Sequence, residues 1–200
     1  MTKPHIAIII ASTRKNRFAD KPAQWLLAEA ATRSDMSFEI VDLRDFDLPL
    51  FDEAGPLAFV PTADPKAQAW RTRMAQFDGY IFVTPEYNYS IPGALKNALD
   101  QAYAEWNRKP AAAFGYGGVG AARAIEALRA IMPALQMVAI GKAVHLSGGE
   151  FFKVSPLGAD GSMDEVAEVL RPSVTAMLDD LSWWANATRA ARRADLAKAA

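Results

Sequence analysis

The sequence predicts an α/β protein in which a parallel sheet of five strands is covered by helices on both faces. Two observations carry this prediction. Short apolar runs rich in β-branched residues alternate along the 200-residue chain with longer segments of helical periodicity. The first run, residues 5–10, is apolar at every position after His5, which is typical of a central strand buried on both faces. Strands that alternate with helices form right-handed crossovers and therefore parallel sheets.

Five runs are expected to be strands. They cover residues 5–10, 38–43, 79–83, 111–114 and 136–140, and the last has an alternative end at Leu146. The expected helices include a segment with Pro22, Trp25, Leu26 and Ala30 on one side, and residues 64–77, 91–105, 121–134 and 163–187.

Three details of these helices can be predicted from single residues. Ser90 is the expected N-cap of the helix over residues 91–105, because its hydroxyl can accept from the first free N–H groups. Pro172 is expected to kink or split the last helix. Residues 189–200 are rich in Ala and Arg, with little apolar periodicity, and are expected to form a frayed or solvated helical tail.

Residues 1–200 are expected to form a single domain, since no repeat, low-complexity segment or linker interrupts them. Five strands joined in this way allow the flavodoxin-like order 2-1-3-4-5, a three-layer sandwich. In that order, the loops after the first, third and fourth strands lie side by side at the carboxyl edge of the sheet, where open α/β sheets bind ligands.

Composition excludes several classes of function. A net charge of −1 gives no reason to expect a nucleic acid or an anionic membrane as partner. The chain has no cysteine, which excludes disulfides and thiolate chemistry and fits a cytoplasmic protein. The apolar run of residues 6–11 is too short for a membrane span or a secretory signal. The only histidines, His5 and His145, are far apart, and no metal site is expected.

The loop after the first strand is the candidate phosphate site. Hydroxyl, amide and cationic side chains gather there between a strand and a helix start; the candidates are Ser12, Arg14, Asn16, Arg17 and Phe18. Free N–H groups and the helix dipole attract anions at such a position, and arginine adds forked donors that match phosphate oxygens. The alternative is a solvated loop whose serine and threonine cap the helix.

The loop after the third strand is the candidate binding wall for a flat ligand. It begins with Pro85, Glu86, Tyr87 and Asn88 and is rigid and aromatic, with two prolines and two tyrosines in residues 85–92. Its backbone N–H groups and Asn88 can hydrogen-bond the polar edge of a heterocycle. The alternative is a stiff turn whose tyrosines pack into the core.

The loop after the fourth strand is rich in glycine and matches G-x-G-x-x-G over residues 115–120. That pattern invites a dinucleotide site, but the acidic residue expected about 20 positions on is missing, since no Asp or Glu occurs between Glu126 and Glu150. Lys142 keeps a 2′-phosphate open as an alternative. The favoured interpretation is that Gly115, Tyr116, Gly117 and Gly118 allow close backbone approach to a ligand held mainly by the other two loops.

With these loops together, the chain resembles the NADPH-dependent FMN reductase family, which includes flavodoxin-like quinone, azo and chromate reductases. The matching segments are Ser12-Thr13-Arg14 with Arg17, Leu48-Pro49-Leu50-Phe51, Pro85-Glu86-Tyr87-Asn88, Ile91-Pro92-Gly93-Ala94-Leu95-Lys96-Asn97-Ala98-Leu99-Asp100, Lys109-Pro110 and Gly117-Gly118-Val119-Gly120-Ala121-Ala122-Arg123. Two departures stand out: Ala11 replaces the family's usual glycine, and Phe18 replaces a second phosphate-binding serine.

The resemblance implies a bound FMN, with its phosphate on the Ser12–Phe18 loop, its isoalloxazine and ribityl at Pro85–Asn88, and the far edge of the ring at Gly115–Gly118. It also implies hydride transfer from NADPH or NADH through FMN to a small acceptor such as a quinone, an azo compound, chromate or free flavin, and a homodimer or tetramer. The alternatives are an FMN-binding electron carrier and a flavin-binding protein without catalysis.

The aromatic residues divide into two groups. Tyr87, Tyr89, Trp106 and Tyr116 are candidates to line the cavity, with core packing as the alternative. Three further tryptophans, Trp25, Trp183 and Trp184, are expected to be core residues.

Overall fold

The computed structural model describes residues 3–199 and contains a five-stranded parallel sheet of order β2-β1-β3-β4-β5, which confirms the predicted topology. The strands are β1 (His5–Ile10), β2 (Ser37–Asp42), β3 (Gly79–Pro85), β4 (Pro110–Tyr116) and β5 (Val138–Leu146). Every residue of β3 and β4 is buried, as expected for central strands with helices on both faces.

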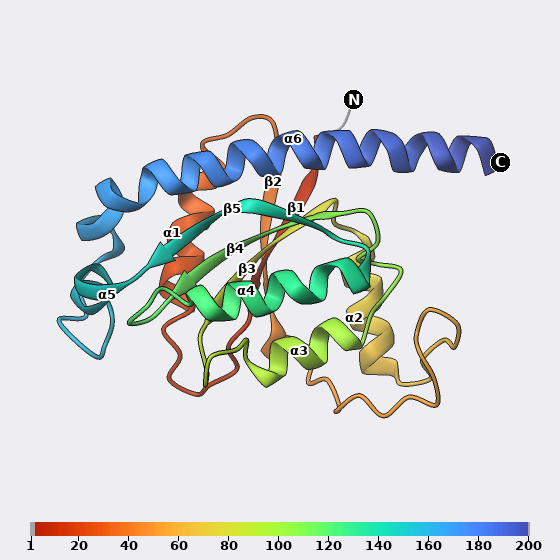
Figure 1. Ribbon diagram of the computed structural model, residues 1–200, viewed down its shortest axis with the longest axis horizontal. Coiled ribbons are helices and arrows are strands. Elements are labelled where there is room, and N and C mark those ends of the chain that lie inside the picture. The colour runs from red at the N-terminus through yellow and green to blue at the C-terminus, as the bar shows by residue number, and fades with distance from the viewer. Residues whose placement is uncertain (1–2, 200) are drawn as a thin grey trace.

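The helices form a layer on each face of the sheet (Figure 1). They are α1 (Asp20–Ala31), α2 (Pro65–Ala75), α3 (Gly93–Asp100), α4 (Ala122–Ile131), α5 (Gly148–Val154) and α6 (Ala167–Ala199), with short 3₁₀ turns at Leu43–Asp45, Met132–Leu135 and Met163–Val166. One face is covered by α1 and α6, and the other by α2, α3 and α4. Within residues 3–199, no helix combines the length and apolarity that crossing a membrane requires.

The helix after β3 differs from the prediction. It begins at Gly93 and ends at Asp100, so it is shorter than residues 91–105, and its N-cap is Pro92. Ser90 is not the cap, because its backbone pairs with Tyr87 in a tight turn that precedes the helix. The short helix α5 was not predicted; its seven residues are too few to show a periodicity.

The last helix is longer and more regular than expected. A 3₁₀ turn at Met163–Val166, capped by Ser162, leads into α6, which continues through Pro172 without a break. The predicted split is wrong, because Pro172 and the preceding turn at Glu168 are exposed and water can solvate the carbonyl that proline leaves unbonded. The prediction that Trp183 is a core residue is also wrong, since 63% of it is exposed, whereas Trp25 is buried.

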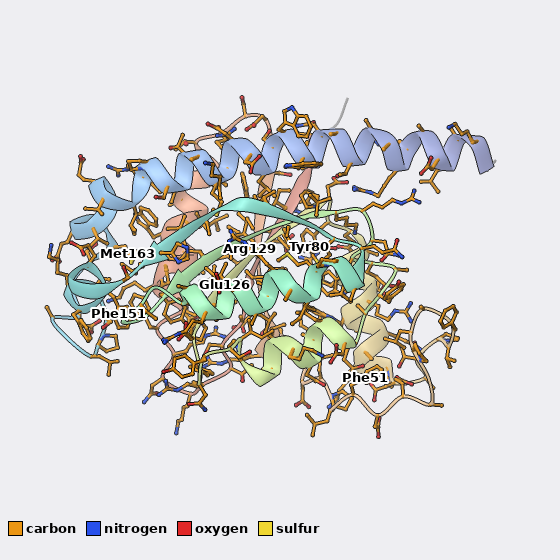
Figure 2. The ribbon with its side chains drawn as sticks, in the orientation of Figure 1. Phe51, Tyr80, Glu126, Arg129, Phe151 and Met163 are labelled. Carbon is orange, nitrogen blue, oxygen red and sulfur yellow. The ribbon has the colours of Figure 1, made fainter. Side chains whose placement is uncertain are left out.

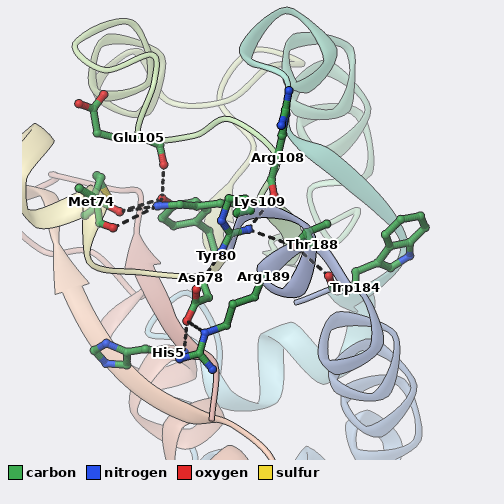
Figure 3. Close-up of polar contacts among 12 residues, drawn as sticks. His5, Met74, Asp78, Tyr80, Glu105, Arg108, Lys109, Trp184, Thr188 and Arg189 are labelled. Atoms are coloured by element: carbon green, nitrogen blue, oxygen red, sulfur yellow. Dashed lines mark hydrogen bonds and ion pairs between the residues drawn. The ribbon is translucent and has the colours of Figure 1, made fainter. Parts of the chain in front are cut away.

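The C-terminal part of α6 is attached to the amino edge of the sheet (Figure 3). Asp78, which precedes β3, pairs with Arg189 at 3.2 Å and with Arg192 at 2.8 Å, and it accepts a hydrogen bond from the His5 backbone at 3.1 Å. The expected solvated tail is therefore held at two of its arginines, although most residues beyond them are exposed.

A buried lysine lies beside this network (Figure 3). The Lys109 ammonium donates to the carbonyls of Met74 and Ala75, at the end of α2, and to the Tyr80 hydroxyl, at 3.1, 3.4 and 3.1 Å. A cation at a helix C-terminus satisfies free carbonyls and complements the helix dipole. Burial, and secondarily the positive charge of Arg192, lower the pKa of Lys109 to about 8.

This depressed pKa predicts a stability that rises with pH. Between pH 8 and pH 10.5 the unfolded chain binds more protons at Lys109 than the folded chain does, so the free energy of unfolding increases with pH there. Urea titrations at pH 7.5 and 9.5 should show the wild type gaining about 2 kcal/mol relative to Lys109→Met over this interval. An unchanged difference between the two proteins would contradict the burial of a charged Lys109.

Candidate functional site

Three loops meet at the carboxyl edge of the sheet, on the left in Figure 1. They follow β1 (residues 11–19), β3 (residues 86–92) and β4 (residues 117–121). The first two are joined directly, because the Ser12 and Tyr87 hydroxyl oxygens are 2.8 Å apart, and Ser12 is fully buried. The hydroxyl of Ser12 therefore fixes the position of the second loop relative to the first.

The first loop offers donors to an anion. Arg14, Lys15 and Asn16 are exposed, and the Arg14 guanidinium lies 5.8 Å from the centroid of the Tyr87 ring. Helix α1 follows at Asp20, with Ala19 as an N-cap that provides no side-chain hydrogen bond. In the first turn of α1 the Lys21 N–H already donates to the Phe18 carbonyl and Pro22 has no N–H, so the cations and the amide of the loop are the main donors to an anion here.

Arg17 holds the first loop in place through ion pairs and a hydrogen bond. Its guanidinium is buried and pairs with Asp42, at the end of β2, and with Asp20, and it donates to the Ser12 carbonyl at 2.8 Å. Burial alone would lower the pKa of Arg17, but the hydrogen bonds to the two carboxylates outweigh it and raise the pKa. The sequence pattern placed Arg17 among the phosphate donors and did not reveal these partners, because Asp42 is 25 residues away.

Phe18 closes the same loop from the side of α5. Its ring makes edge-to-face contacts with Tyr116 at 5.3 Å and with Phe151 at 5.5 Å between centroids. Phe151 lies on α5, at the carboxyl-edge end of the molecule (Figure 2). Phe18, at the position where the family usually has a phosphate-binding serine, thus packs the first loop against α5.

The second loop is a two-residue hairpin. Tyr87 and Ser90 exchange two backbone hydrogen bonds of 2.9 and 3.1 Å, and the residues between them have positive φ, 50° for Asn88 and 67° for Tyr89. Positive φ at both central positions defines a type I′ turn, which asparagine tolerates and tyrosine adopts only at a cost. The hairpin is therefore rigid, and it presents the Tyr89 ring, 68% exposed, at the rim of the site.

Glu86 makes a side-chain contact that the sequence did not predict, and the expected contribution of its backbone N–H to a ligand stays a prediction. Its carboxylate is nearly buried and accepts from the Arg123 guanidinium and from the backbone N–H of Arg123 at 3.0 Å. Burial opposes ionisation, but the hydrogen bonds from Arg123 prevail and lower the pKa of Glu86. The carboxylate therefore joins the second loop to the start of α4.

The third loop combines a tight side with an open side. A Cβ at Gly115 would lie 2.3 Å from the Gly120 carbonyl oxygen, so glycine is required there for β4 to pass the start of α4. A Cβ at Gly117 or Gly118 would meet nothing within 4 Å, so the backbone at these two residues borders open space. Such a surface allows a ligand to approach the main chain closely.

The aromatic candidates separate clearly. Trp106 is fully buried and donates to the Leu99 carbonyl at 3.1 Å, so it is a core residue and does not line the site. Tyr116 is also buried. Burial raises the pKa of its hydroxyl, and hydrogen bonding to Ser12 offsets part of that effect. Tyr87 and Tyr89 remain as the tyrosines of the hairpin.

A further contact joins two of the segments that carried the family resemblance. The Asn97 side chain, on α3, donates to the Pro49 carbonyl at 2.8 Å and accepts from the Phe51 N–H at 2.9 Å. Beside this contact lies a cleft of about 480 Å³ that reaches the first loop at Thr13; its other lining residues include Arg44, Leu48, Leu50 and Ala94. The amide of Asn97 thus fixes one wall of the cleft, a role that no periodicity predicts.

Replacing Asn97 with alanine should loosen residues 48–51. The Phe51 N–H loses its partner and the Pro49 carbonyl keeps only its hydrogen bond from Gln101, so we expect a loss of about 1–3 kcal/mol in the free energy of unfolding and faster amide exchange at Phe51. Urea denaturation and hydrogen exchange measure the two effects. Lys96→Ala, which removes only an exposed pair with Asp100, is the control and should change stability by less than about 0.5 kcal/mol.

Comparison with known proteins agrees with this geometry. The family model described as NADPH-dependent FMN reductase matches residues 4–150. An NAD(P)H-dependent FMN reductase of Schizosaccharomyces pombe is 36% identical over 136 residues, which are 67% of this chain and 68% of the relative. A 2-hydroxy-1,4-benzoquinone reductase of Burkholderia sp is 33% identical over 187 residues, 90% of this chain and 94% of that protein.

A solved structure extends the similarity to three dimensions. The flavoenzyme FerB, an NAD(P)H:(acceptor) oxidoreductase of Paracoccus denitrificans, superposes with a TM-score of 0.67 at 28% identity and covers 89% of this chain and 97% of its own. The fold is thus flavodoxin-like, as the strand order indicated. With the family match extending over all three loops, the chain belongs to the NADPH-dependent FMN reductase family and is an FMN-dependent oxidoreductase.

Proposed function

We propose that FMN binds across the three loops, with its phosphate at Arg14, Asn16 and the rest of the loop before α1. The observation that carries this proposal is the convergence of a cationic loop, a rigid hairpin and an open glycine backbone at one edge of the sheet. The residues fit the group: an anion meets the exposed cations and the amide of the first loop, and a flat ring meets the hairpin and the backbone of Gly117 and Gly118. Arg17 does not contact the phosphate in this proposal; its ion pair with Asp42 holds the first loop against the end of β2.

These contacts indicate which tasks belong to FMN and which to the side chains. When bound, FMN supplies the redox chemistry, taking a hydride from NADPH or NADH and passing electrons to the acceptor. The chain's own residues bind and orient: Tyr87 and Asn88 set the wall for the ring, and Ser12 ties that wall to the phosphate loop. No side chain is assigned as acid or base, because Glu86 is engaged by Arg123 and its pKa is lowered.

A quinone is the acceptor that we propose, in a cytoplasmic enzyme. Support comes from the Burkholderia relative, which is named for a benzoquinone and matches over nearly the whole chain. If donor and acceptor use one open face in turn, initial rates at several fixed concentrations of 1,4-benzoquinone should give parallel double-reciprocal lines against NADPH. Intersecting lines would exclude a shared face, and turnover only with azo dyes, chromate or free flavin would reject the quinone.

We further propose that the enzyme is a homodimer or a dimer of dimers. An apolar groove of about 710 Å³ lies between the segment after β2 and the end of α3; its lining includes Phe51, Leu57, Phe59, Tyr103 and Leu135. Leu50 and Phe59 are more than four-fifths exposed, and contiguous exposed apolar surface of this kind marks an interface. Sedimentation of the wild type and of Phe59→Glu tests the proposal: a monomeric wild type would contradict it.

Arg14→Ala should weaken FMN binding while leaving the fold intact. The variant removes a charge-assisted hydrogen bond worth about 1.5–3 kcal/mol, so the Kd for FMN should rise about tenfold to a hundredfold. Quenching of FMN fluorescence measures the affinity. Arg171→Ala, which removes an exposed arginine of α6 that pairs with Glu29 near the end of α1, is the control, and an FMN affinity unchanged by Arg14→Ala would reject the phosphate assignment.

A further inference from the structure

Arg123, in the first turn of α4, contacts the second loop in two ways. Its guanidinium pairs with Glu86, with Nε 2.5 Å from Oε1, and its Cζ lies 3.9 Å from the centroid of the Tyr89 ring. One side chain thus holds the residue before the hairpin and one of the two residues at its tip. Stacking of a guanidinium on an aromatic face favours this arrangement, and it holds Tyr89 in the backbone conformation that tyrosine adopts only at a cost.

The start of α4 depends on the same contacts. Its N-cap residue, Ala121, has a φ of 56° and provides no side-chain hydrogen bond. The cap comes instead from Glu86, whose carboxylate accepts from the N–H groups of Arg123 at 3.0 Å and Ala124 at 3.4 Å. A carboxylate at this position satisfies free N–H groups and complements the helix dipole. Glu86, directly before the hairpin, therefore caps the helix that follows the glycine loop.

We propose that Arg123 is a positioning residue that fixes the hairpin Tyr87–Ser90 against the start of α4, and so holds the hairpin and the glycine loop at a fixed separation. Gly120 and Ala121 lead directly into this helix, so the orientation of Gly117 and Gly118 is set by the same anchor. This inference rests on the proposed function only in that the two loops are taken to flank one FMN ring. The hairpin's order is a property of the chain itself.

Amide hydrogen exchange, measured without FMN, tests the anchor directly. Arg123→Ala should increase exchange at the Tyr87 and Ser90 amides about tenfold or more, because the hairpin loses both its ion pair and its ring contact. Arg123→Lys restores a charge but not the planar fork, so its exchange rates should lie between those of the wild type and Arg123→Ala. Tyr89→Leu, which keeps the ion pair and removes the ring, should also be intermediate.

Arg129→Ala is the matched control. Arg129 lies two turns along α4 (Figure 2) and donates to the Ile140 and Gly141 carbonyls, so its loss removes an arginine of the same helix without touching the hairpin. Hairpin exchange should stay at the wild-type rate. An Arg123→Ala protein whose hairpin amides exchange at the wild-type rate would overturn the proposal.

A second readout, the Kd for FMN, separates this proposal from the proposed function. In a protein that binds FMN, Arg123→Ala should raise the Kd about tenfold and Arg123→Lys less, with Arg129→Ala unchanged. A wild type that binds no FMN would reject the cofactor site, while the exchange rates would still decide whether Arg123 positions the hairpin. An unchanged Kd in Arg123→Ala would show that the loop separation does not matter to the ligand, and would overturn that part of the inference.

Discussion

Gly115→Ala is expected to destabilise the protein by about 3 kcal/mol or more and to abolish FMN binding. The added Cβ would lie 2.3 Å from the Gly120 carbonyl oxygen and 2.9 Å from both Ala121 Cβ and Ile125 Cδ1. Gly120 and Ala121 are consecutive residues at the buried start of α4, so neither can move away from the added Cβ without displacing the helix. Urea denaturation followed by circular dichroism gives the stability, and FMN fluorescence gives the affinity.

Gly118→Ala is the matched variant in the same loop. A Cβ there meets no protein atom within 4 Å, so stability should change by less than about 0.5 kcal/mol. If a ligand approaches the backbone at this residue, the added methyl group should nevertheless weaken FMN binding. The pair thus separates the structural role of the loop from its binding role, and a Gly115→Ala protein as stable as the wild type would contradict the close approach of β4 to the start of α4.

Asp78→Ala is expected to cost about 3 kcal/mol, because it removes a carboxylate that is itself largely buried and pairs with two partly buried arginines. Arg189 and Arg192 both pair with Asp78, and the cation nearby, Lys109, is itself buried (Figure 3). The C-terminal part of α6 should then exchange its amide hydrogens much faster than residues 167–185, whose apolar face stays packed on the sheet.

Asp195→Ala is the control for this effect. Asp195 pairs with Arg108 on the surface, where both side chains are more than half exposed, and its removal should cost less than about 0.5 kcal/mol. If the two variants had equal stability and left the end of α6 equally protected, the anchoring role of Asp78 would be wrong.

Much of the fold could be predicted because its signals are local. The apolar runs of β1 and β3 and the turn residues between elements depend only on neighbours in sequence, and the crossover rule then limits the topology. The positions of the three loops follow from that topology. The end of the hairpin was mispredicted because Ser90 satisfies both a capping pattern and a turn, and its pairing with Tyr87 is the stronger local constraint.

The connections within the site could not be predicted in this way. Arg17 was expected to contact phosphate, yet its partner Asp42 comes from a neighbouring strand end, and only the sheet order brings them together. Glu86 reaches Arg123 across 37 residues, and no spacing rule relates the two. Such pairs depend on which strand ends lie side by side, so a sequence pattern indicates the residue types of the site but not their partners.

Anaerobic titration of the purified protein with NADPH, followed by visible absorbance, tests the central claim most directly. A flavoenzyme reduced by a pyridine nucleotide should be yellow, or become yellow with added FMN, and should bleach as NADPH is added. A yellow protein that does not bleach would contradict reduction of the flavin by NADPH and indicate an electron carrier or a flavin-binding protein without catalysis. A colourless protein that takes up no FMN would contradict the three-loop site itself.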